Sequence, residues 1–295
     1  MTTSTARVGD LDIAYETFGD PSDPAALLVM GLGTQMIAWP DQLCQDIAAT
    51  GRYVVRFDNR DVGLSTHLDH LPAPAPGRVL LRLDKAPYSI GDMARDTIGL
   101  MDVLGFDTVD LVGASMGGFI SQSVAIQAPE RLRSLTLIMT STGSRRVGRP
   151  SPRVGRQLVS RRPMRTREEA VAAAVQVFTL IGSPGFALDE TYLEQRAAAS
   201  YDRGYDPKGY LRQLAAVLTQ PDRTRKLKAL DIPTLVMHGL HDPLVASSGG
   251  LALARTIPGS RFVGFSGMGH DLPRELWQPM AQEIASIVQR AAAPV

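Results

Sequence analysis

The 295-residue sequence contains one cysteine, Cys44, and no long apolar run. A single cysteine cannot form an intramolecular disulfide, and it excludes a cysteine-rich metal site. Apolar runs such as residues 135–139 are far shorter than the roughly 18 residues that a transmembrane helix needs. The first residues lack a basic stretch followed by an apolar one, so we predict no signal peptide and no membrane span, and expect a cytoplasmic protein.

The sequence also lacks an overall excess of charge. Its 31 Lys and Arg residues face 30 Asp and Glu residues, which leaves a net charge of +1 and predicts no nucleic-acid partner. One segment departs from this balance, because residues 145–167 hold nine arginines and no acidic residue. We interpret it as a solvated surface paired with acids elsewhere. The alternative is a basic surface that steers an anionic substrate or docks on an anionic surface.

Short apolar segments are plentiful in this chain, which is 44% hydrophobic and 21% charged, as in globular proteins. Most are continuous and bounded by Gly, Asp or Pro, which is typical of strands buried on both faces of a parallel sheet. Helical periodicity lies between them, as in residues 93–104 and 277–288. These patterns predict an α/β fold with a mostly parallel central sheet flanked by helices. The predicted strands are residues 11–18, 26–30, 53–57, 109–112, 135–139, 233–237 and 262–265.

The strand pattern disappears between residues 144 and 230. Candidate helices there cover residues 167–181, 189–199 and 207–218, with Gly and Pro between them. We therefore predict a helical cap at 144–230, inserted into a core made of residues 1–143 and 231–295. The proline-rich stretch 71–77 is predicted to be a stiff loop.

The most specific motif is Gly113-Ala114-Ser115-Met116-Gly117, a G-x-S-x-G between a predicted strand and a helical stretch. This motif sets the serine on a sharp turn, where its hydroxyl stands clear of the sheet. Glycines on either side leave no Cβ where strand and helix pass closely. The helix N-terminus adds free amides for a developing oxyanion. The pattern predicts Ser115 as a nucleophile.

A serine nucleophile needs a base and an orienting acid. His270 follows the last predicted strand, and Asp242 follows the strand before it. Their order after Ser115 is the order of this architecture, so we predict a catalytic triad. The alternative for Asp242 is an ordinary turn residue before proline. We expect His67 and His70 to be solvated in a polar loop.

A metal site formed by His238, His241, Asp242 and His270 is a competing interpretation. However, His238 to Asp242 lies on a turn, and no second ligand cluster accompanies it. We therefore predict no metal and no cofactor, and expect His238 to be packed or partly exposed.

An oxyanion hole needs two backbone amides. We predict the amide of Met116, next to the nucleophile, and that of Leu32, with Gly33 as second choice in the loop 31–35. Tyr205 is a further pocket candidate, and an ion pair between Arg60 and Asp61 is expected to hold their turn. The predicted apolar pocket comprises Gly33, Met36, Trp39, Phe119, Phe178 and Met268.

Five segments together resemble the α/β-hydrolase superfamily over nearly the whole chain: GASMGG, VMGLGT, FDNRDVGLS, HGLHDPL and GMGHDLP. Within it, the chain is most similar to the aclacinomycin methylesterase group, whose members hydrolyse a methyl ester on an anthracycline polyketide. One departure is Met30-Gly31, where the superfamily usually has His-Gly; the backbone donor is unaffected. The resemblance implies the same triad and the same donors, Ser115, Asp242, His270, Leu32 and Met116.

These observations predict a serine hydrolase that cleaves a carboxylic ester of a small molecule through an acyl-serine. A methyl ester of a polyketide-like or other apolar compound is the candidate substrate. The same triad would also serve a lactonase, a C–C bond hydrolase or a cofactor-free perhydrolase. A ligand-binding protein on a hydrolase scaffold is the non-enzyme alternative. We expect a monomer or homodimer.

Overall fold

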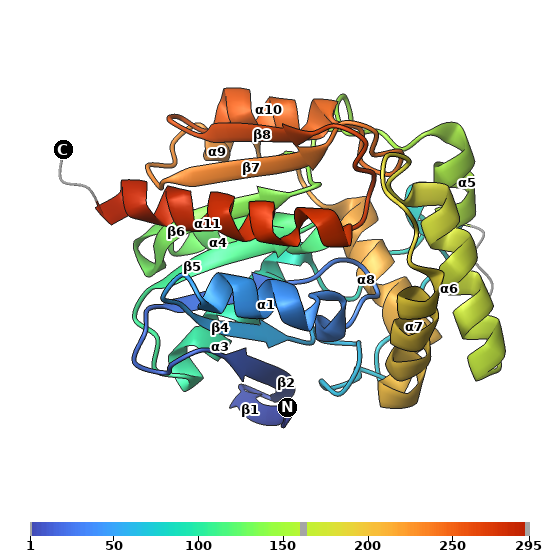
Figure 1. Ribbon diagram of the computed structural model, residues 1–295. Helices are drawn as coiled ribbons and strands as arrows, with labels where there is room; N and C mark the ends of the chain where they lie inside the picture. Colours follow the sequence, from blue (N-terminus) through green and yellow to red (C-terminus); the bar gives the residue numbers. More distant parts are fainter. Residues whose placement is uncertain (1, 160–163, 293–295) are drawn as a thin grey trace.

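The computed structural model describes residues 2–159 and 164–292. Eight strands form one sheet in the order β1-β2-β4-β3-β5-β6-β7-β8, and from β4 onward all pairs are parallel. The mostly parallel sheet predicted from the sequence is confirmed (Figure 1). The strands are β1 Ser4–Val8, β2 Leu11–Phe18, β3 Ala25–Val29, β4 Tyr53–Phe57, β5 Val109–Ala114, β6 Leu132–Ile138, β7 Thr234–Gly239 and β8 Arg261–Phe265.

The apolar runs of the central strands supply two cores at once. In β3, Leu27 and Val29 belong to the core on one face, whereas Ala26 and Leu28 belong to the core on the other. Strands buried on both faces need apolar residues at every position, which explains the continuous runs. The first face is covered by α3 Ile90–Val103, α4 Met116–Gln127 and α10 Ser248–Thr256; the second by α1 Asp41–Ala48 and α11 Trp277–Ala292, which lie in front of the sheet in Figure 1.

In the described residues between β6 and β7 there are five helices. Four of them stand beyond the end of the sheet in Figure 1, on the side where the parallel strands end. The short α9 contacts α4 and α10 instead. They are α5 Pro152–Val159, α6 Arg167–Ile181, α7 Glu190–Gly204, α8 Pro207–Thr219 and α9 Thr224–Leu227. No helix among the described residues is both long and apolar enough to cross a membrane.

Two expectations about loops were wrong. The proline-rich stretch 71–77 is not entirely loop, because α2 Pro76–Leu80 begins inside it. Pro76 occupies the first helical turn, where a missing N–H costs nothing. His67 is not solvated either: it is half-buried, with its ring nitrogens 3.1 Å from Asp206 Oδ2 and 2.9 Å from the Gly63 carbonyl.

Arg60 and Asp61 do not form the expected ion pair with each other. Arg60 pairs with Asp96 of α3. Asp61 has a left-handed backbone (φ 68°), and its carboxylate binds Arg212 of α8 instead, at 2.8 and 2.9 Å. Both Asp61 and Arg212 are fully buried. The turn after β4 is therefore held by ion pairs with α3 and α8, and not by an ion pair within the turn.

Candidate active site

Ser115 lies at the sharp turn between β5 and α4, with φ 56° and ψ −117°. A non-glycine residue in this region is strained, so the surroundings must hold it there. Its amide donates to the Ile138 carbonyl at 2.9 Å. A Cβ on Gly117 would lie 2.1 Å from the Val29 carbonyl oxygen, and one on Gly113 would lie 2.4 Å from the Gly117 oxygen. Only glycine fits at either position, as the motif requires.

Ser115, His270 and Asp242 form a hydrogen-bonded series. The distance from His270 Nε2 to Ser115 Oγ is 3.0 Å, and that from His270 Nδ1 to Asp242 Oδ2 is 2.7 Å. The second carboxylate oxygen, Oδ1, accepts from the amides of Leu244 and Val245, each at 2.8 Å. A carboxylate at Nδ1 favours the tautomer that leaves Nε2 free to accept the serine proton. The arrangement is suited to proton transfer from hydroxyl to imidazole.

The segment between α6 and α7 holds the loop that carries His270. The His270 amide donates to the Ile181 carbonyl at 2.7 Å, and the Gly269 amide donates to Ser183 Oγ at 2.8 Å. Farther along, the Gly185 amide donates to the Gly267 carbonyl at 2.9 Å. These contacts join segments about 90 residues apart in the sequence. These hydrogen bonds have no local sequence motif, and the sequence analysis therefore did not predict them.

His238 packs beside Asp242 and bonds to the backbone. It is fully buried, its Nε2 lies 2.7 Å from the Val245 carbonyl, and Asp242 Oδ2 is 3.6 Å away. Burial lowers the pKa of His238 and so favours the neutral ring. His241 Nδ1 accepts from the Gly267 amide at 3.1 Å.

The described residues bring together one other group with metal-ligating atoms, Asp61, His67 and Asp206. Arg212 binds both carboxylates, at 2.8 Å and 2.9 Å. A guanidinium in this position supplies the positive charge that a metal ion would bring, so the cluster is an ion-pair network in character.

The loop after β3 lies against Ser115. A Cβ on Gly31 would come within 3.1 Å of the Ser115 Cβ. Gly33, the second choice as oxyanion donor, has its amide occupied by Gln213 Oε1 at 2.8 Å. Within the described part of the chain, the amides of Leu32 and Met116 have no acceptor, and Met116 begins α4, where amides lack helical partners. This leaves the predicted pair, Leu32 and Met116, as the available donors.

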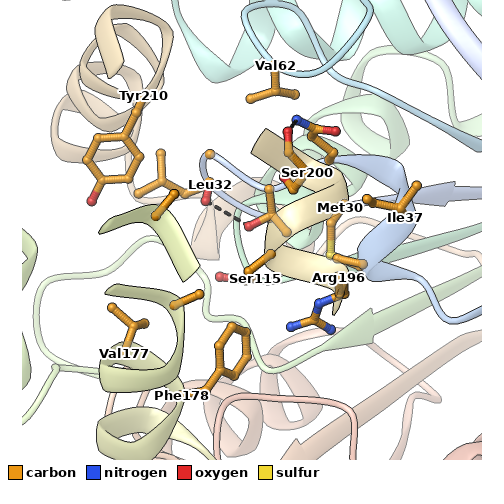
Figure 2. A pocket seen from close by; sticks show the side chains of 18 of the residues that line it. Met30, Leu32, Ile37, Val62, Ser115, Val177, Phe178, Arg196, Ser200 and Tyr210 are labelled. Carbon is orange, nitrogen blue, oxygen red and sulfur yellow. Dashed lines mark hydrogen bonds between the residues drawn. The ribbon is translucent and has the colours of Figure 1, made fainter. Parts of the chain in front are cut away.

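A cavity of about 370 Å³ opens above Ser115. Figure 2 shows the Ser115 hydroxyl directed into it, with Tyr210 on one side and Phe178 on another. Most of its wall is apolar, and part of that wall comes from α6, α7 and α8. The apolar wall includes Met30, Leu32, Ile37, Val62, Ala170, Ala174, Val177, Phe178, Ile181 and Leu193.

Of the residues predicted for the pocket, Gly33, Phe178 and Tyr205 line this cavity. The prediction was wrong for Met36, Trp39, Phe119 and Met268, which lie outside the lining and are at most 8% exposed. Trp39 and Met268 pack in the core beneath α1 and α11, and Phe119 belongs to the opposite core. The wall comes instead from the loops after β3 and β4 and from helices beyond the sheet, whose inward faces are set by tertiary packing.

The arginines of the segment 145–167 are exposed wherever the structure describes them. Arg161 and Arg162 lie outside the described residues. Arg167 pairs with Asp202 at 3.0 Å, which agrees with a solvated surface partly balanced by acids elsewhere. The exposed arginines are Arg145, Arg146, Arg149, Arg153, Arg156, Arg165 and Arg167.

Residues 24–273 match the family described as the alpha/beta hydrolase fold. The chain therefore belongs to the α/β-hydrolase family, as its motifs indicated. Among solved structures, it is similar to an enol-lactonase from Burkholderia xenovorans LB400, with a TM-score of 0.76 and 22% identity over 97% of this chain and 100% of that one. A thermophilic esterase from Thermogutta terrifontis gives a TM-score of 0.70 at 23% identity, over 99% and 100% of the two chains. These likenesses confirm the fold.

Among curated proteins, the chain is similar to rhodomycin D methylesterases. It is 27% identical to DauP of Streptomyces sp. strain C5 and 27% identical to DnrP of Streptomyces peucetius, with 99% of each chain covered in both comparisons. It is also 28% identical to 3-oxoadipate enol-lactonase 2 of Acinetobacter baylyi, over 86% of this chain and 84% of that protein. The family and these relatives support a carboxylic-ester hydrolase, and the resemblance to methylesterases is confirmed.

Proposed function

We propose that this protein hydrolyses a carboxylic ester through an acyl-serine intermediate on Ser115. The observation that carries the proposal is the hydrogen-bonded series from Ser115 Oγ through His270 to Asp242, at 3.0 and 2.7 Å. It lies where the hydroxyl faces an apolar cavity (Figure 2). A base within about 3 Å of a hydroxyl, oriented by a buried carboxylate, is the arrangement that activates serine.

The catalytic cycle follows from this geometry. His270 Nε2 removes the hydroxyl proton as Ser115 Oγ attacks the ester carbonyl, and Asp242 stabilises the imidazolium. The amides of Leu32 and Met116 receive the oxyanion, and each such donor contributes about 3 kcal/mol. His270 then protonates the departing alcohol. Water, activated by the same imidazole, attacks the acyl-serine and releases the acid, so the cycle uses only the chain's own groups and water.

The substrate that we propose is a methyl ester on an apolar, ring-bearing acid. The cavity of about 370 Å³ is within the range of small-molecule sites, and its walls are mostly aliphatic and aromatic. Similarity to two rhodomycin D methylesterases over 99% of the chain supports a methyl ester. The small leaving group then needs little space, and the acyl part occupies the cavity.

Two measurements test the proposal. Ser115→Ala is expected to lower kcat on methyl 2-naphthoate by about 10⁴- to 10⁶-fold, because the nucleophile is lost. A fluorophosphonate probe is expected to label the wild-type serine and not the variant. Retention of more than a few per cent of the activity, or equal labelling of both proteins, would overturn the assignment. A folded wild-type protein that binds esters without labelling or turnover would be a ligand-binding protein.

A lactone is the second candidate substrate. The similarity to 3-oxoadipate enol-lactonase 2 over 86% of the chain favours it, and an enol-lactone is opened by the same acyl-serine chemistry. A panel of methyl esters, enol-lactones and vinylogous diketones separates ester, lactone and C–C bond hydrolysis. Peroxide added to the ester assay detects perhydrolysis. We expect the highest kcat/KM on methyl esters.

A further inference from the structure

The cavity above Ser115 contains a half-buried positive charge that the proposed catalytic cycle does not use. Among the described residues that line it, Arg196 of α7 is the single arginine or lysine. Figure 2 places its guanidinium near Met30 and Phe178, across the cavity from Tyr210. The guanidinium carbon lies 4.9 Å from the centre of the Phe178 ring and 5.7 Å from that of Tyr192.

Arg196 has no carboxylate partner within the described parts of the chain. Three acidic residues line the described cavity, and two of them, Asp61 and Asp206, form ion pairs with Arg212. Asp271 accepts from the Ser183 hydroxyl, and among the described residues it acts on Arg196 through its charge without forming an ion pair with it. Burial raises the pKa of Asp271, although its hydrogen bonds with Ser183 and the charge of Arg196 act in the opposite direction.

The surroundings of Arg196 disfavour its positive charge, because no carboxylate among the described residues forms an ion pair with it. Burial lowers the pKa of the Arg196 guanidinium, while the Tyr192 hydroxyl and the nearby Asp271 carboxylate partly oppose that shift. An arginine nevertheless stays protonated near neutral pH. A desolvated charge is unfavourable unless an opposite charge reaches it. An anionic ligand would therefore gain more from Arg196 than from an exposed arginine.

We propose that Arg196 binds a carboxylate on the acyl part of the substrate, so that the preferred substrates are half-esters of apolar, ring-bearing dicarboxylic acids. This inference rests on the proposed function, because the ester must lie at Ser115 while the second carboxylate reaches Arg196. The planar guanidinium offers paired N–H donors that match a carboxylate. The Phe178 ring beneath it provides an apolar surface for the substrate's own ring.

The kinetic test compares two esters that differ only in charge, the monomethyl and dimethyl esters of naphthalene-2,6-dicarboxylic acid. The wild-type protein is expected to favour the monomethyl ester in kcat/KM. Arg196→Met is expected to lower kcat/KM for the monomethyl ester by about 10- to 100-fold, the range for a hydrogen bond to a charged group, and for the diester by less than about threefold. Arg196→Lys, which keeps the charge, is expected to restore part of the loss.

Arg153→Met is the matched control, because Arg153 is exposed on α5 and does not line the cavity. It is expected to leave both kcat/KM values unchanged. If Arg153→Met lowers them as Arg196→Met does, the effect comes from surface charge and the inference is overturned. Equal wild-type turnover of the two esters, unaffected by Arg196→Met, also overturns it while leaving ester hydrolysis intact.

A binding measurement on a protein without turnover tests the carboxylate site at Arg196 separately from the proposed ester hydrolysis at Ser115. In Ser115→Ala protein, calorimetry is expected to show that 2-naphthoate binds at least about tenfold more tightly than 2-naphthamide, since only the former is charged. This measurement needs no change at Arg196 and is unaffected if Arg196→Met fails to fold. Equal affinities overturn the anion site. Absence of turnover of every ester by wild-type protein overturns the proposed function, and with it the half-ester assignment.

Discussion

The Gly33 amide donates a hydrogen bond to the side-chain oxygen of Gln213 at 2.8 Å. The nitrogen of the same Gln213 side chain donates to the Arg60 carbonyl at 2.7 Å. Gly33 belongs to the loop after β3, and Gln213 belongs to α8, so a helix outside the sheet holds the loop that carries the Leu32 amide. Leu32 is the proposed oxyanion donor, and such donors act through fixed position, so this contact makes the geometry of the proposed donor depend on α8.

Replacement of Gln213 by leucine is expected to lower kcat on a methyl ester by about tenfold and to change KM less. The substitution removes the acceptor of the Gly33 amide, and the loop then loses the constraint that aims Leu32. Steady-state kinetics measure the effect. Thr219→Val on the same helix is the control, because the Thr219 hydroxyl bonds only carbonyls of its own helix. A larger change in KM than in kcat would assign Gln213 to substrate binding instead.

The turn at the serine depends on Gly117. An alanine Cβ there would lie 2.1 Å from the Val29 carbonyl oxygen, which is backbone and cannot turn aside. Gly117→Ala is therefore expected to reduce the free energy of unfolding by about 3 kcal/mol, at the upper end of overpacking effects. Gly91→Ala in α3 meets only Ser89 Oγ at 3.4 Å and is expected to stabilise by about 0.5–1 kcal/mol. Urea unfolding compares the two; equal stabilities would show that the turn relaxes freely.

The strands and the G-x-S-x-G turn could be predicted from the sequence, because each depends on residues that are close together in the chain. Each strand from β3 to β8 carries its own apolar run, and β2 alternates apolar and polar residues. The G-x-S-x-G motif requires its glycines for steric reasons that the structure reproduces at Gly113 and Gly117. Strand β1 was missed because it is a five-residue edge strand with alternating exposure and three polar or basic residues among STARV. Edge strands are buried on one side only, so their apolar signal is weak.

The cavity wall was predicted poorly for a different reason. Phe119 follows Ser115 by four residues, and Trp39 follows the loop 31–35 that was predicted to face the serine. Both side chains nevertheless pack into the cores on the two faces of the sheet. The residues that do face the cavity, such as Val177 and Arg196, belong to helices whose orientation is set by long-range contacts. One of these is the buried pair of Arg212 and Asp61, separated by 151 positions in the chain. Such pairing depends on the tertiary fold, and no spacing in the sequence reveals it.

Arg212→Met is expected to reduce the free energy of unfolding by about 3–5 kcal/mol, since it leaves the fully buried Asp61 without its cation. The Tyr88 hydroxyl, 2.7 Å from Asp61 Oδ2, cannot replace a charge. Arg95→Met removes an exposed pair with Asp92 and is expected to cost at most about 1 kcal/mol. Denaturant titration of both variants makes the comparison. A similar, small effect for both would mean that water reaches Asp61 in the variant.

His67 links the turn after β4 to the start of α8. Its Nδ1 lies 3.1 Å from Asp206 Oδ2 and its Nε2 lies 2.9 Å from the Gly63 carbonyl oxygen. Both neighbours are acceptors, so the ring satisfies both only when each nitrogen carries a proton. Burial acts to lower the pKa of His67, but these hydrogen bonds and the nearby carboxylates raise it above its ordinary value of 6.5.

A pKa raised by folding means that His67 stabilises the native state fully below about pH 6.5, and that this contribution disappears as the pH rises through the native pKa. The excess stability of the wild-type protein over His67→Gln is therefore expected to be larger at about pH 5.5 than at about pH 9. The pKa of Asp206 is lowered, so its carboxylate remains charged at the acidic end. Urea unfolding at both pH values measures this difference, and His70→Gln, at an exposed position nearby, is expected to show none. An excess that grows toward alkaline pH would mean that the neutral ring makes the stabilising contact.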